Sequence, residues 1–385
     1  MTKTEHLFIV GAGFSRHAGL PLTTEFTEKL LDLKGLKKDD PSSLLVPFLR
    51  DFVNNTFGHG PSSNPADWPE LEDIFTCIDL SANTGHHLGP KYSPSYLRTV
   101  RRALIVRIIR MLRRTYTEGK KTPDHHWKLL EEFLSSLAYE KCAFLSMNWD
   151  TVIEEGLKRT QGISSFDYGC NAKLVKKSST QLSAVPPEND QVEILKPHGS
   201  ANWMYCDACR QVFWLPPCTT QWIADQLFRE PDWKIVQKVI HKDYAQPPRP
   251  YNCPDCSASA LGTRFATFSY RKALDFTMHE RSWDSAEQLL RTATTWVFLG
   301  YSLPAADYEF KLLLKRVQLS RSTAPHLVLI TGGGRVAYNT ERSYQKFFGP
   351  GISKIFKNGL DSAAQKHLRK IGALRAFKLK PGIRT

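Results

Sequence analysis

The sequence predicts an α/β fold in which a parallel sheet is interrupted by a helical insertion and carries a four-cysteine zinc module. Short apolar runs are each followed by a polar or glycine-rich turn and a helical pattern, which is typical of parallel strands connected through helices. About 130 residues separate the first two runs, whereas a strand–helix–strand unit needs roughly 30. Two Cys-x-x-Cys pairs lie between the second and third runs.

Four runs have the continuous apolar character of strands that are buried on both faces. They are Leu7–Val10, Cys142–Met147, Thr295–Leu299 and His326–Ile330. We place the N-terminal cap of the first helix that follows at Thr23 or Thr24, and another helix at Thr151–Lys158. Rossmann-like sheets of this kind bind ligands at the carboxyl ends of their strands, so the turns after the runs are the expected site.

The interval after the first run indicates a helical insertion at about 30–135. Its clearest element is Leu97–Tyr116, where apolar residues lie on one face and arginines on the other, so we expect an amphipathic helix that packs on the domain. The apolar stripe is Val100, Leu104, Ile108 and Leu112, and the arginines are Arg101, Arg102, Arg110, Arg113 and Arg114. Segments 55–69, 176–191 and 244–252 are rich in Pro, Ser or Asn and are expected to be loops.

The formal net charge of +14 is concentrated in two segments. Residues 98–121 carry a net +8 and residues 335–385 a net +10, so the rest of the chain is mildly acidic. Such patches suit nucleic-acid phosphates, an acidic partner or an anionic cofactor, or they are solvated helix faces. Neither segment contains the residues considered below for chemistry, so we assign the charge to assembly or regulation, and direct nucleic-acid binding stays open.

The lengths of the apolar runs also indicate the cellular compartment of the protein. None approaches the roughly 18–20 residues of a membrane helix, and no run of signal-peptide length precedes the first strand. We therefore expect a cytoplasmic protein without a membrane partner.

Four of the eight cysteines have a regular spacing that predicts a structural zinc site. Cys206 and Cys209 form one Cys-x-x-Cys knuckle, Cys253 and Cys256 form the other, and 43 residues lie between the two. Each knuckle can present two thiolates to one side of a tetrahedral Zn²⁺. Four sulfur ligands leave no open position, so this zinc is not expected to be catalytic.

Two further motifs are weaker when taken alone. Gly11-Ala12-Gly13 after the first strand either lets backbone N–H groups approach a pyrophosphate or simply makes a tight turn. The third glycine of the dinucleotide fingerprint is displaced to Gly19, which disfavours a hydride-transfer enzyme. His198, eight residues before the first knuckle, is a core residue, a metal ligand or a general base.

Five motifs, taken in order along the chain, resemble those of the sirtuin superfamily. They are GAGFSRHAGLP at 11–21, MNWD at 147–150, HGS at 198–200, the two knuckles, and GYSLP at 300–304. The resemblance covers nearly the whole chain. It implies a sirtuin-like NAD-binding catalytic domain at 1–331, with the zinc module at about 200–262, and a basic C-terminal extension at 332–385. It also implies NAD⁺ as the substrate and a structural Zn²⁺.

The resemblance assigns a role to each motif. The glycine turn cradles the phosphates of NAD⁺, the Asn and Asp of N-x-D line the nicotinamide–ribose pocket, the His of HG acts as base, and the G-x-S turn contacts the dinucleotide. The implied catalytic residues are Asn148, Asp150 and His198. The implied NAD⁺-binding residues are Gly11, Ala12, Gly13, Phe14, Ser15, Asn148, Asp150, Gly300 and Ser302.

Departures from the family pattern bear on the reaction. A protein deacylase of this family continues the first motif as G-I-P-D-F-R, whereas Leu22–Phe26 follows Pro21 here, and only Phe265–Lys272 lies where its acyl-peptide strand would be. Three segments resemble the bacterial sirtuin-like branch, which typically hydrolyses NAD⁺ in anti-phage defence: Glu70–Phe75, Trp296–Phe310 and Arg342–Gly349. Many members of that branch lack the zinc module.

The candidate residues suit such a hydrolysis chemically. The nicotinamide–ribose bond breaks through an oxocarbenium-like state, so the site must orient the nicotinamide and present water to the anomeric carbon. Asn148 can position ribose or water, Asp150 can accept the carboxamide N–H, and His198 can take a proton from a ribose hydroxyl or water. Asn148 and Asp150 can instead cap the following helix, and Ser302 can cap a helix or contact a phosphate.

Three hypotheses remain open. The leading one is an NAD⁺ glycohydrolase that releases nicotinamide and ADP-ribose and is gated, since an uncontrolled NADase would harm its own cell. The others are an NAD-dependent protein-lysine deacylase, which the zinc module favours, and a non-catalytic NAD- or nucleic-acid-binding scaffold. By analogy with relatives, the expected partners besides NAD⁺ are further copies of the chain in a homo-oligomer and a HerA-type ATPase or a short Argonaute.

Overall fold

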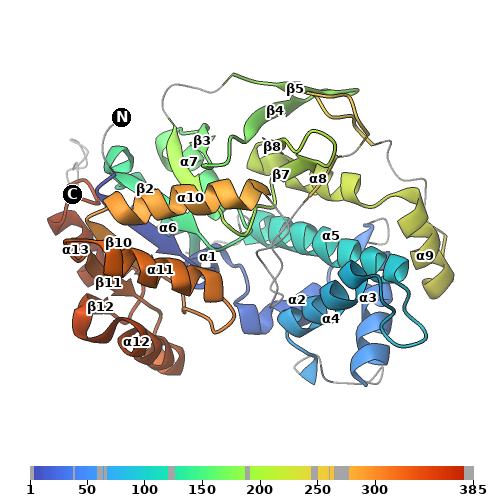
Figure 1. Ribbon diagram of the computed structural model, residues 1–385, viewed down its shortest axis with the longest axis horizontal. Coiled ribbons are helices and arrows are strands. Elements are labelled where there is room, and N and C mark those ends of the chain that lie inside the picture. Colours follow the sequence, from blue (N-terminus) through green and yellow to red (C-terminus); the bar gives the residue numbers. More distant parts are fainter. Residues whose placement is uncertain are drawn as a thin grey trace, which may run out of the picture.

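The computed structural model describes residues 4–37, 40–58, 64, 67–119, 126–186, 191–243, 250–259, 261–263 and 277–376. It confirms the predicted fold class. A Rossmann-like parallel sheet lies between two layers of helices, and a smaller sheet carries a four-cysteine cluster (Figure 1). None of the helices in these ranges is long and apolar enough to cross a membrane.

The central sheet has seven strands in the order β12-β11-β10-β1-β2-β6-β3, and every neighbouring pair is parallel. The bounds are β1 His6–Val10, β2 Cys142–Ser146, β3 Phe166–Asp167, β6 Val192–Leu195, β10 Thr295–Leu299, β11 His326–Ile330 and β12 Ile352–Phe356. β1, β2, β10 and β11 are the four predicted strands. The strand order reverses beside β1, which is the position where open α/β sheets bind ligands.

Side chains of β1 alternate between two cores. Phe8 and Val10 belong to one core, and Leu7 and Ile9 to the other, so both faces of the strand are covered. The first face is covered by α6 His126–Ser135, α7 Val152–Gln161 and α13 Ser362–Lys370, and the second by α10 Thr277–Thr292, α11 Tyr308–Ser320 and α12 Gly334–Phe348. This double coverage explains the continuous apolar runs in the sequence.

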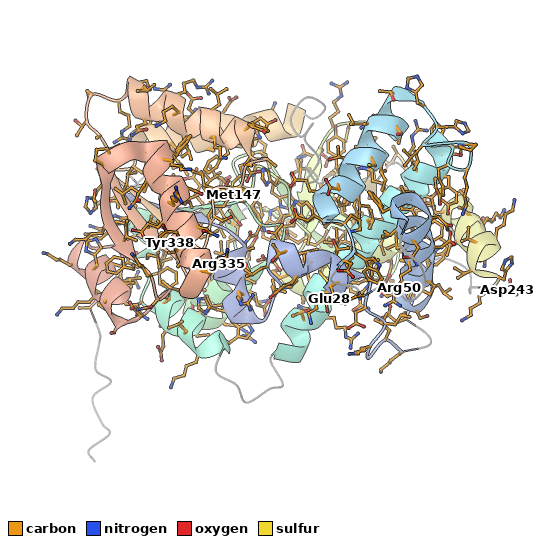
Figure 2. The ribbon with its side chains drawn as sticks, turned by 90° about the horizontal axis from the view of Figure 1, so that it is seen from below. Glu28, Arg50, Met147, Asp243, Arg335 and Tyr338 are labelled. Atoms are coloured by element: carbon orange, nitrogen blue, oxygen red, sulfur yellow. The ribbon has the colours of Figure 1, made fainter. Side chains whose placement is uncertain are left out.

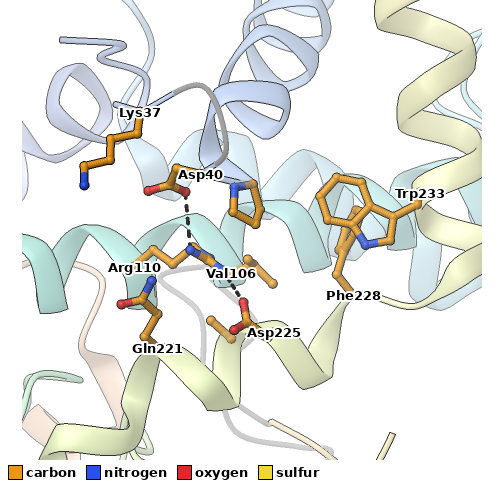
Figure 3. Close-up of a pocket in the computed structure, with 10 residues that line it drawn as sticks. Lys37, Asp40, Val106, Arg110, Gln221, Asp225, Phe228 and Trp233 are labelled. Carbon is orange, nitrogen blue, oxygen red and sulfur yellow. Dashed lines mark hydrogen bonds and ion pairs between the residues drawn. The ribbon is translucent and has the colours of Figure 1, made fainter. Parts of the chain in front are cut away.

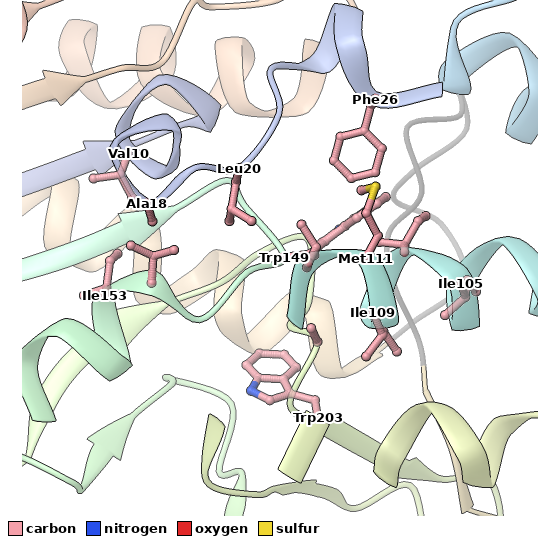
Figure 4. Close-up of a cluster of buried hydrophobic side chains, with 14 of the residues drawn as sticks. Val10, Ala18, Leu20, Phe26, Ile105, Ile109, Met111, Trp149, Ile153 and Trp203 are labelled. Carbon is pink, nitrogen blue, oxygen red and sulfur yellow. The ribbon is translucent and has the colours of Figure 1, made fainter. Parts of the chain in front are cut away.

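Helices fill the interval between β1 and β2, as predicted. After the short α1 Ala12–Ser15 they are α2 Phe26–Leu30, α3 Ser42–Phe57, α4 Leu71–Thr84 and α5 Pro94–Gly119, followed by α6. The apolar stripe of α5 is buried, with Ile108 fully inaccessible. Figure 4 shows Ile109 and Met111 of α5 in one cluster with Phe26 and Trp149, so the insertion packs on the turn that follows β2.

The arginine face of α5 is only in part the solvated face that was one interpretation of its charge. Arg110 is 6% exposed, and burial of Arg107 lowers the pKa of its guanidinium to about 10. Ion pairs join Arg101 to Asp79 (2.7 Å), Arg102 to Asp232, and Arg110 to both Asp40 (3.3 Å) and Asp225. Part of the positive charge of 98–121 is therefore neutralised inside the molecule, where α5 meets acidic residues of other elements.

The second sheet has the order β5-β4-β8-β7-β9, and two helices lie between β8 and β9 in the chain. The bounds are β4 Lys173–Lys177, β5 Leu182–Ala184, β7 Trp203–Cys206, β8 Val212–Trp214, β9 Leu261–Gly262, α8 Thr220–Leu227 and α9 Glu230–Ile240. The prediction of a loop at 176–191 is wrong where β5 pairs antiparallel with β4. This edge hairpin buries only Val175 and Leu182, so its sequence is mostly polar.

The described residues also form short 3₁₀ helices: η1 Arg16–Ala18, η2 Thr23–Glu25, η4 Tyr139–Lys141, η5 Pro217–Thr219 and η6 Gly349–Gly351. The predicted threonine cap is wrong. The turn begins after Leu22, whose backbone N–H donates to Oε2 of Glu25 at 3.1 Å. The carboxylate of Glu25 thus binds back to the residue before the turn, and neither threonine side chain caps it.

The segment expected as a C-terminal extension contributes α12, β12 and α13 through residue 376. β12 hydrogen-bonds to β11 as the edge strand of the central sheet, so this part of the segment belongs to the sheet rather than following it. Arg335 and Tyr338 on α12 lie at the surface seen in Figure 2, and Tyr338 is 61% exposed. Residues 377–385 lie outside the described residues.

Gly300, at the end of β10, makes a close backbone contact at the carboxyl edge of the sheet, and a substitution there tests that contact. A Cβ there would lie 2.2 Å from the backbone nitrogen of Phe14, and the residue has φ +64°. We expect Gly300→Ala to lower the free energy of unfolding by about 1–3 kcal/mol or more, from backbone strain and the clash. Urea denaturation measures the loss.

Gly332 is the matched control for this substitution, because it follows the neighbouring strand β11 and has no atom within 4 Å of a built Cβ. Gly332→Ala should change the stability by less than about 1 kcal/mol. Equal effects of the two substitutions would contradict the close contact at Gly300.

Candidate functional site

Three of the turns expected at the site lie side by side at the carboxyl edge of the sheet. β1 pairs with β2 on one side and β10 on the other, so that Val10 is level with both Ser146 and Leu299. The glycine turn, the Asn148–Asp150 turn and the Gly300–Ser302 turn therefore leave the sheet at neighbouring positions.

The glycine turn packs on the Gly300 turn through backbone atoms. The N–H of Gly13 donates to the carbonyl oxygen of Gly300 at 2.9 Å, and a Cβ on Gly11 would lie 2.7 Å from Cα of Tyr301. Phe14 points into the core, and Ala12 and Gly13 are half-buried. Both glycines are thus required by this contact, whatever ligand the turn also binds.

Asn148 is joined to the glycine turn. Its Nδ2 donates to Oγ of Ser15 at 2.9 Å, and Ser15 is only 2% exposed. The structure therefore brings together two candidate residues that the sequence places 133 positions apart.

Asp150 and Ser302 are placed differently. Oδ1 of Asp150 accepts the backbone N–H of Val152 at 3.0 Å, which is the helix-capping role considered as its alternative. Asp150 also lines a cavity of about 20 Å³ together with Arg113 of α5. No described hydrogen bond or ion pair joins its carboxylate to Asn148 or His198, and Ser302 is exposed.

His198 is buried, with 5% of its surface exposed, and lies beside the turn that holds Asn148. Its Nδ1 is 3.3 Å from the carbonyl oxygen of Met147. The indole N–H of Trp149 donates to the His198 carbonyl at 3.0 Å, and the N–H of Ala201 donates to the Trp149 carbonyl at 2.8 Å. The H-G-S loop and the N-x-D turn are thus held together by main-chain and side-chain bonds.

Asp307 and Tyr301 belong to this group, although the sequence analysis gave them no role. Oδ1 of Asp307 is 3.9 Å from Nε2 of His198, and the Tyr301 hydroxyl donates to Oδ2 of Asp307 at 2.6 Å. Burial and the neighbouring carboxylate raise the pKa of Tyr301 well above its usual value, so the hydroxyl keeps its proton. The only sequence signal was an acidic residue shortly after the G-x-S turn.

A buried polar network lies behind the same loops and was also missed. Lys196, which is fully buried, donates to the carbonyl oxygen of Asp150, to Oε1 of Glu154 at 3.1 Å and to Oγ of Ser200 at 2.7 Å. The Ser200 hydroxyl donates in turn to Oδ1 of Asn202 at 2.6 Å. One ammonium group therefore ties the N-x-D turn to the H-G-S loop and α7.

The four predicted metal ligands are brought together. The Sγ atoms of Cys206, Cys209, Cys253 and Cys256 all lie within 4.8 Å of one another. Cys206 and Cys256 are 3.7 Å apart, as are Cys209 and Cys253. Four sulfurs about 2.3 Å from a tetrahedral Zn²⁺ would be about 3.8 Å apart, so these residues fit that ion.

The two knuckles have the same backbone conformation. The carbonyl oxygen of the first cysteine accepts an N–H from four residues on, at 2.8 Å from Arg210 and 2.9 Å from Ser257. Both of these residues have positive φ, +60° and +61°. Such a turn directs the two thiolates of each pair to one side, as a shared tetrahedral ion requires.

The larger described cavity lies away from all of these residues. It has a volume of about 350 Å³ and is lined by α5, α8 and the residues around Asp40 and Trp233 (Figure 3). Arg110 bridges Asp40 and Asp225 in its wall, so these three charges satisfy one another. We assign no ligand to it.

Comparison with known proteins adds little to this picture. No protein-family model matches the sequence, and no curated protein matches it. Among solved structures the chain is similar to SIR2 in complex with the inhibitor EX-527, 2′-O-acetyl-ADP-ribose and deacetylated p53 peptide. The sequence identity is 12%, the match covers 96% of this chain and 94% of that chain, and the TM-score is 0.33. The assignment of the site therefore rests on the residues of this chain.

The four-cysteine cluster predicts the metal content of the protein. We expect one Zn²⁺ per chain, lost in Cys253→Ser, together with much of the stability of the β7–β9 region, because structural zinc contributes about 10–16 kcal/mol of binding energy to folding. Metal analysis of the purified protein measures the zinc. Cys218→Ser is the matched control, because Cys218 is exposed and outside the cluster. A zinc content that is unchanged in Cys253→Ser would contradict the assignment.

The buried Lys196–Glu154 pair predicts an asymmetric mutational effect. Glu154→Leu leaves the Lys196 ammonium without its counter-charge and should cost about 3–5 kcal/mol of unfolding free energy. Adding Lys196→Met should recover part of that loss. Urea denaturation measures the unfolding free energy of both variants. The control is Glu155→Leu, which breaks a more exposed pair with Arg159 and should cost less than about 1 kcal/mol. Equal losses in Glu154→Leu and Glu155→Leu would show that the buried pair has no special weight.

Proposed function

We propose that the chain is a sirtuin-like NAD⁺ glycohydrolase that releases nicotinamide and ADP-ribose. The observation that carries the proposal is the hydrogen bond from Asn148 to Ser15, which joins the N-x-D motif to the glycine turn, with His198 held against Met147 beside it. These residues lie at the switch point of the sheet, where a dinucleotide is expected.

The reaction is written with NAD⁺ as substrate. The bond between C1′ of the ribose and the nicotinamide nitrogen breaks, and its electron pair neutralises the pyridinium. A water oxygen bonds to C1′, and the proton it loses passes to Nε2 of His198. Asn148 positions the ribose or the water through its amide, and each such group typically contributes about 10²–10⁴-fold.

Asp150 has a narrower role in this proposal than the sequence suggested. One carboxylate oxygen caps α7, which leaves the other to accept the carboxamide N–H of nicotinamide. The backbone N–H groups of Gly11–Ser15 and the Gly300 turn are assigned to the phosphates, and Ser302 to their exposed rim.

Burial of the histidine supports a gated enzyme. His198 is 5% exposed, and the ring of Trp283 on α10 lies 6.3 Å from its imidazole, centroid to centroid. Water and ribose must reach Nε2, so α10 or the loop at Asp307 has to move before turnover. A defence effector that depletes NAD⁺ only after a trigger fits this requirement.

A protein-lysine deacylase is the second candidate, and the four-cysteine cluster favours it. The segment Phe265–Lys272, where an acyl-peptide strand would be sought, lies outside the described residues. The two reactions differ in one simple requirement: a deacylase releases nicotinamide only in the presence of an acylated peptide.

The test is incubation of the protein with NAD⁺, with and without acetyl-lysine peptide, followed by chromatography of the products. We expect nicotinamide and ADP-ribose without peptide, released at a slow basal rate because the gate opens only part of the time without its trigger. Asn148→Ala and His198→Ala should lower this rate at least about 100-fold. Asn339→Ala and His86→Ala alter exposed residues of the same types and should keep full activity. Dependence on the peptide would support the deacylase, and full activity of both site variants would overturn the site.

A further inference from the structure

We propose that Asp307, anchored by Tyr301, is a positioning residue that stabilises a proton on Nε2 of His198. The inference deepens the proposed function and rests on it for its catalytic meaning. Its geometric basis is independent of any substrate, because it concerns three side chains that the fold itself brings together: His198, Asp307 and Tyr301.

The hydrogen bond of Nδ1 determines which nitrogen of His198 can act as base. The carbonyl oxygen of Met147 can only accept, so the 3.3 Å contact requires the proton of the neutral imidazole to be on Nδ1. Nε2 then carries the lone pair and is the nitrogen that can take a proton. This is the nitrogen that faces Asp307.

The position of Asp307 suits a stabiliser of the protonated form. Its Oδ1 lies 3.9 Å from Nε2, within ion-pair distance of an imidazolium. Oδ2 is occupied by the Tyr301 hydroxyl at 2.6 Å, so the carboxylate is held on one side and presents its other oxygen to the histidine. The side chains of His198 and Asp307 are 6% and 5% exposed, and water screens their attraction weakly.

Uncharged groups among the described residues lie against both members of the pair. His198 also faces the Met147 carbonyl and the uncharged ring of Trp283. On the side of Asp307, Tyr301 keeps its proton, and its backbone carbonyl accepts the hydroxyl of Tyr344, whose pKa is also raised by burial. The ammonium of Lys311 on α11 is a further charge near Asp307. Burial lowers the pKa of Lys311, and the Asp307 carboxylate offsets part of that shift.

The consequence is a base–carboxylate pair. In the proposed hydrolysis a proton leaves a water or ribose hydroxyl and binds Nε2, and the resulting imidazolium forms an ion pair with Asp307, which stays ionised. Orientation and charge stabilisation by a buried carboxylate is the logic of catalytic triads, here with the carboxylate on the side of Nε2 instead of Nδ1. The 3.9 Å interval has no room for another oxygen, so the reacting oxygen must approach Nε2 from the side or displace Asp307.

The test is NMR titration of the full chain labelled in its 12 histidines, with His198→Gln to assign the signal. We expect the neutral form of His198 to carry its proton on Nδ1, as read from the nitrogen shifts of the unmodified protein. In Asp307→Asn the midpoint of the His198 titration should move to lower pH by about one unit, because the opposite charge 3.9 Å away, which favoured the protonated form, is gone.

Glu309→Gln is the matched control, since it neutralises a carboxylate two positions away on α11 and should leave the His198 midpoint unchanged. A proton on Nε2 in the neutral form overturns the proposal without requiring any variant to fold. So does an unchanged midpoint in folded Asp307→Asn.

Activity separates this proposal from the proposed function. If NAD⁺ is hydrolysed, the acid limb of kcat/KM should move to lower pH in Asp307→Asn, and its plateau should fall by at least about tenfold because His198 is a weaker base. A shifted titration without NAD⁺ hydrolysis would keep the pair and reject the glycohydrolase. If NAD⁺ is hydrolysed but the His198 midpoint does not move in Asp307→Asn, the glycohydrolase is supported and the His198–Asp307 pair is rejected.

Discussion

Gly13 donates its backbone N–H to the carbonyl oxygen of Gly300, and neither residue has room for a side chain at this contact. The arrangement of the candidate site depends on it, since both halves of the site start from these two turns. Two residues beyond Gly13, Ser15 receives the amide of Asn148. One residue beyond Gly300, Tyr301 anchors Asp307 beside His198. A backbone contact thus sets the distance between the amide and the histidine–carboxylate pair.

Buried charges determine how the other parts of the chain dock on this edge. Arg110 lies between Asp40 and Asp225, and so joins α5 to the N-terminal side of α3 and to α8. Lys196 joins the N-x-D turn to the H-G-S loop. Such pairs contribute little net stability, because burying each charge costs about as much as the pairing returns. Their effect here is on arrangement, since a shifted insertion or loop would leave a charge buried without its partner.

The sequence was sufficient to predict those strands and helices whose own burial produces a clear hydrophobic pattern. β1, β2, β10 and β11 are buried on both faces, so their apolar runs are continuous and easily found. β12, Ile-Ser-Lys-Ile-Phe, is an edge strand with exposed polar residues in its middle, and β3 has only two residues, so neither has a detectable pattern. The arginines of α5 show the converse failure. Helical periodicity identified their face correctly but could not show that acidic residues from elsewhere in the chain would cover it.

The candidate site, too, could be predicted from the sequence only where its residues stand in local motifs. Asn148 and His198 stand in motifs, and the turns that hold them follow strands, which places them at one edge of the sheet. The partner of His198 could not be found in this way, because Asp307 lies more than one hundred residues further along and reaches the histidine only through the pairing of β10 with β1. The metal ligands were the clearest case, since cysteine spacing alone carries the geometry. Their place in the fold gives the cluster a further consequence. Cys206 ends β7, and β7 begins directly after the H-G-S-A-N loop, so an ion held by the four thiolates fixes one end of a strand whose other end positions His198.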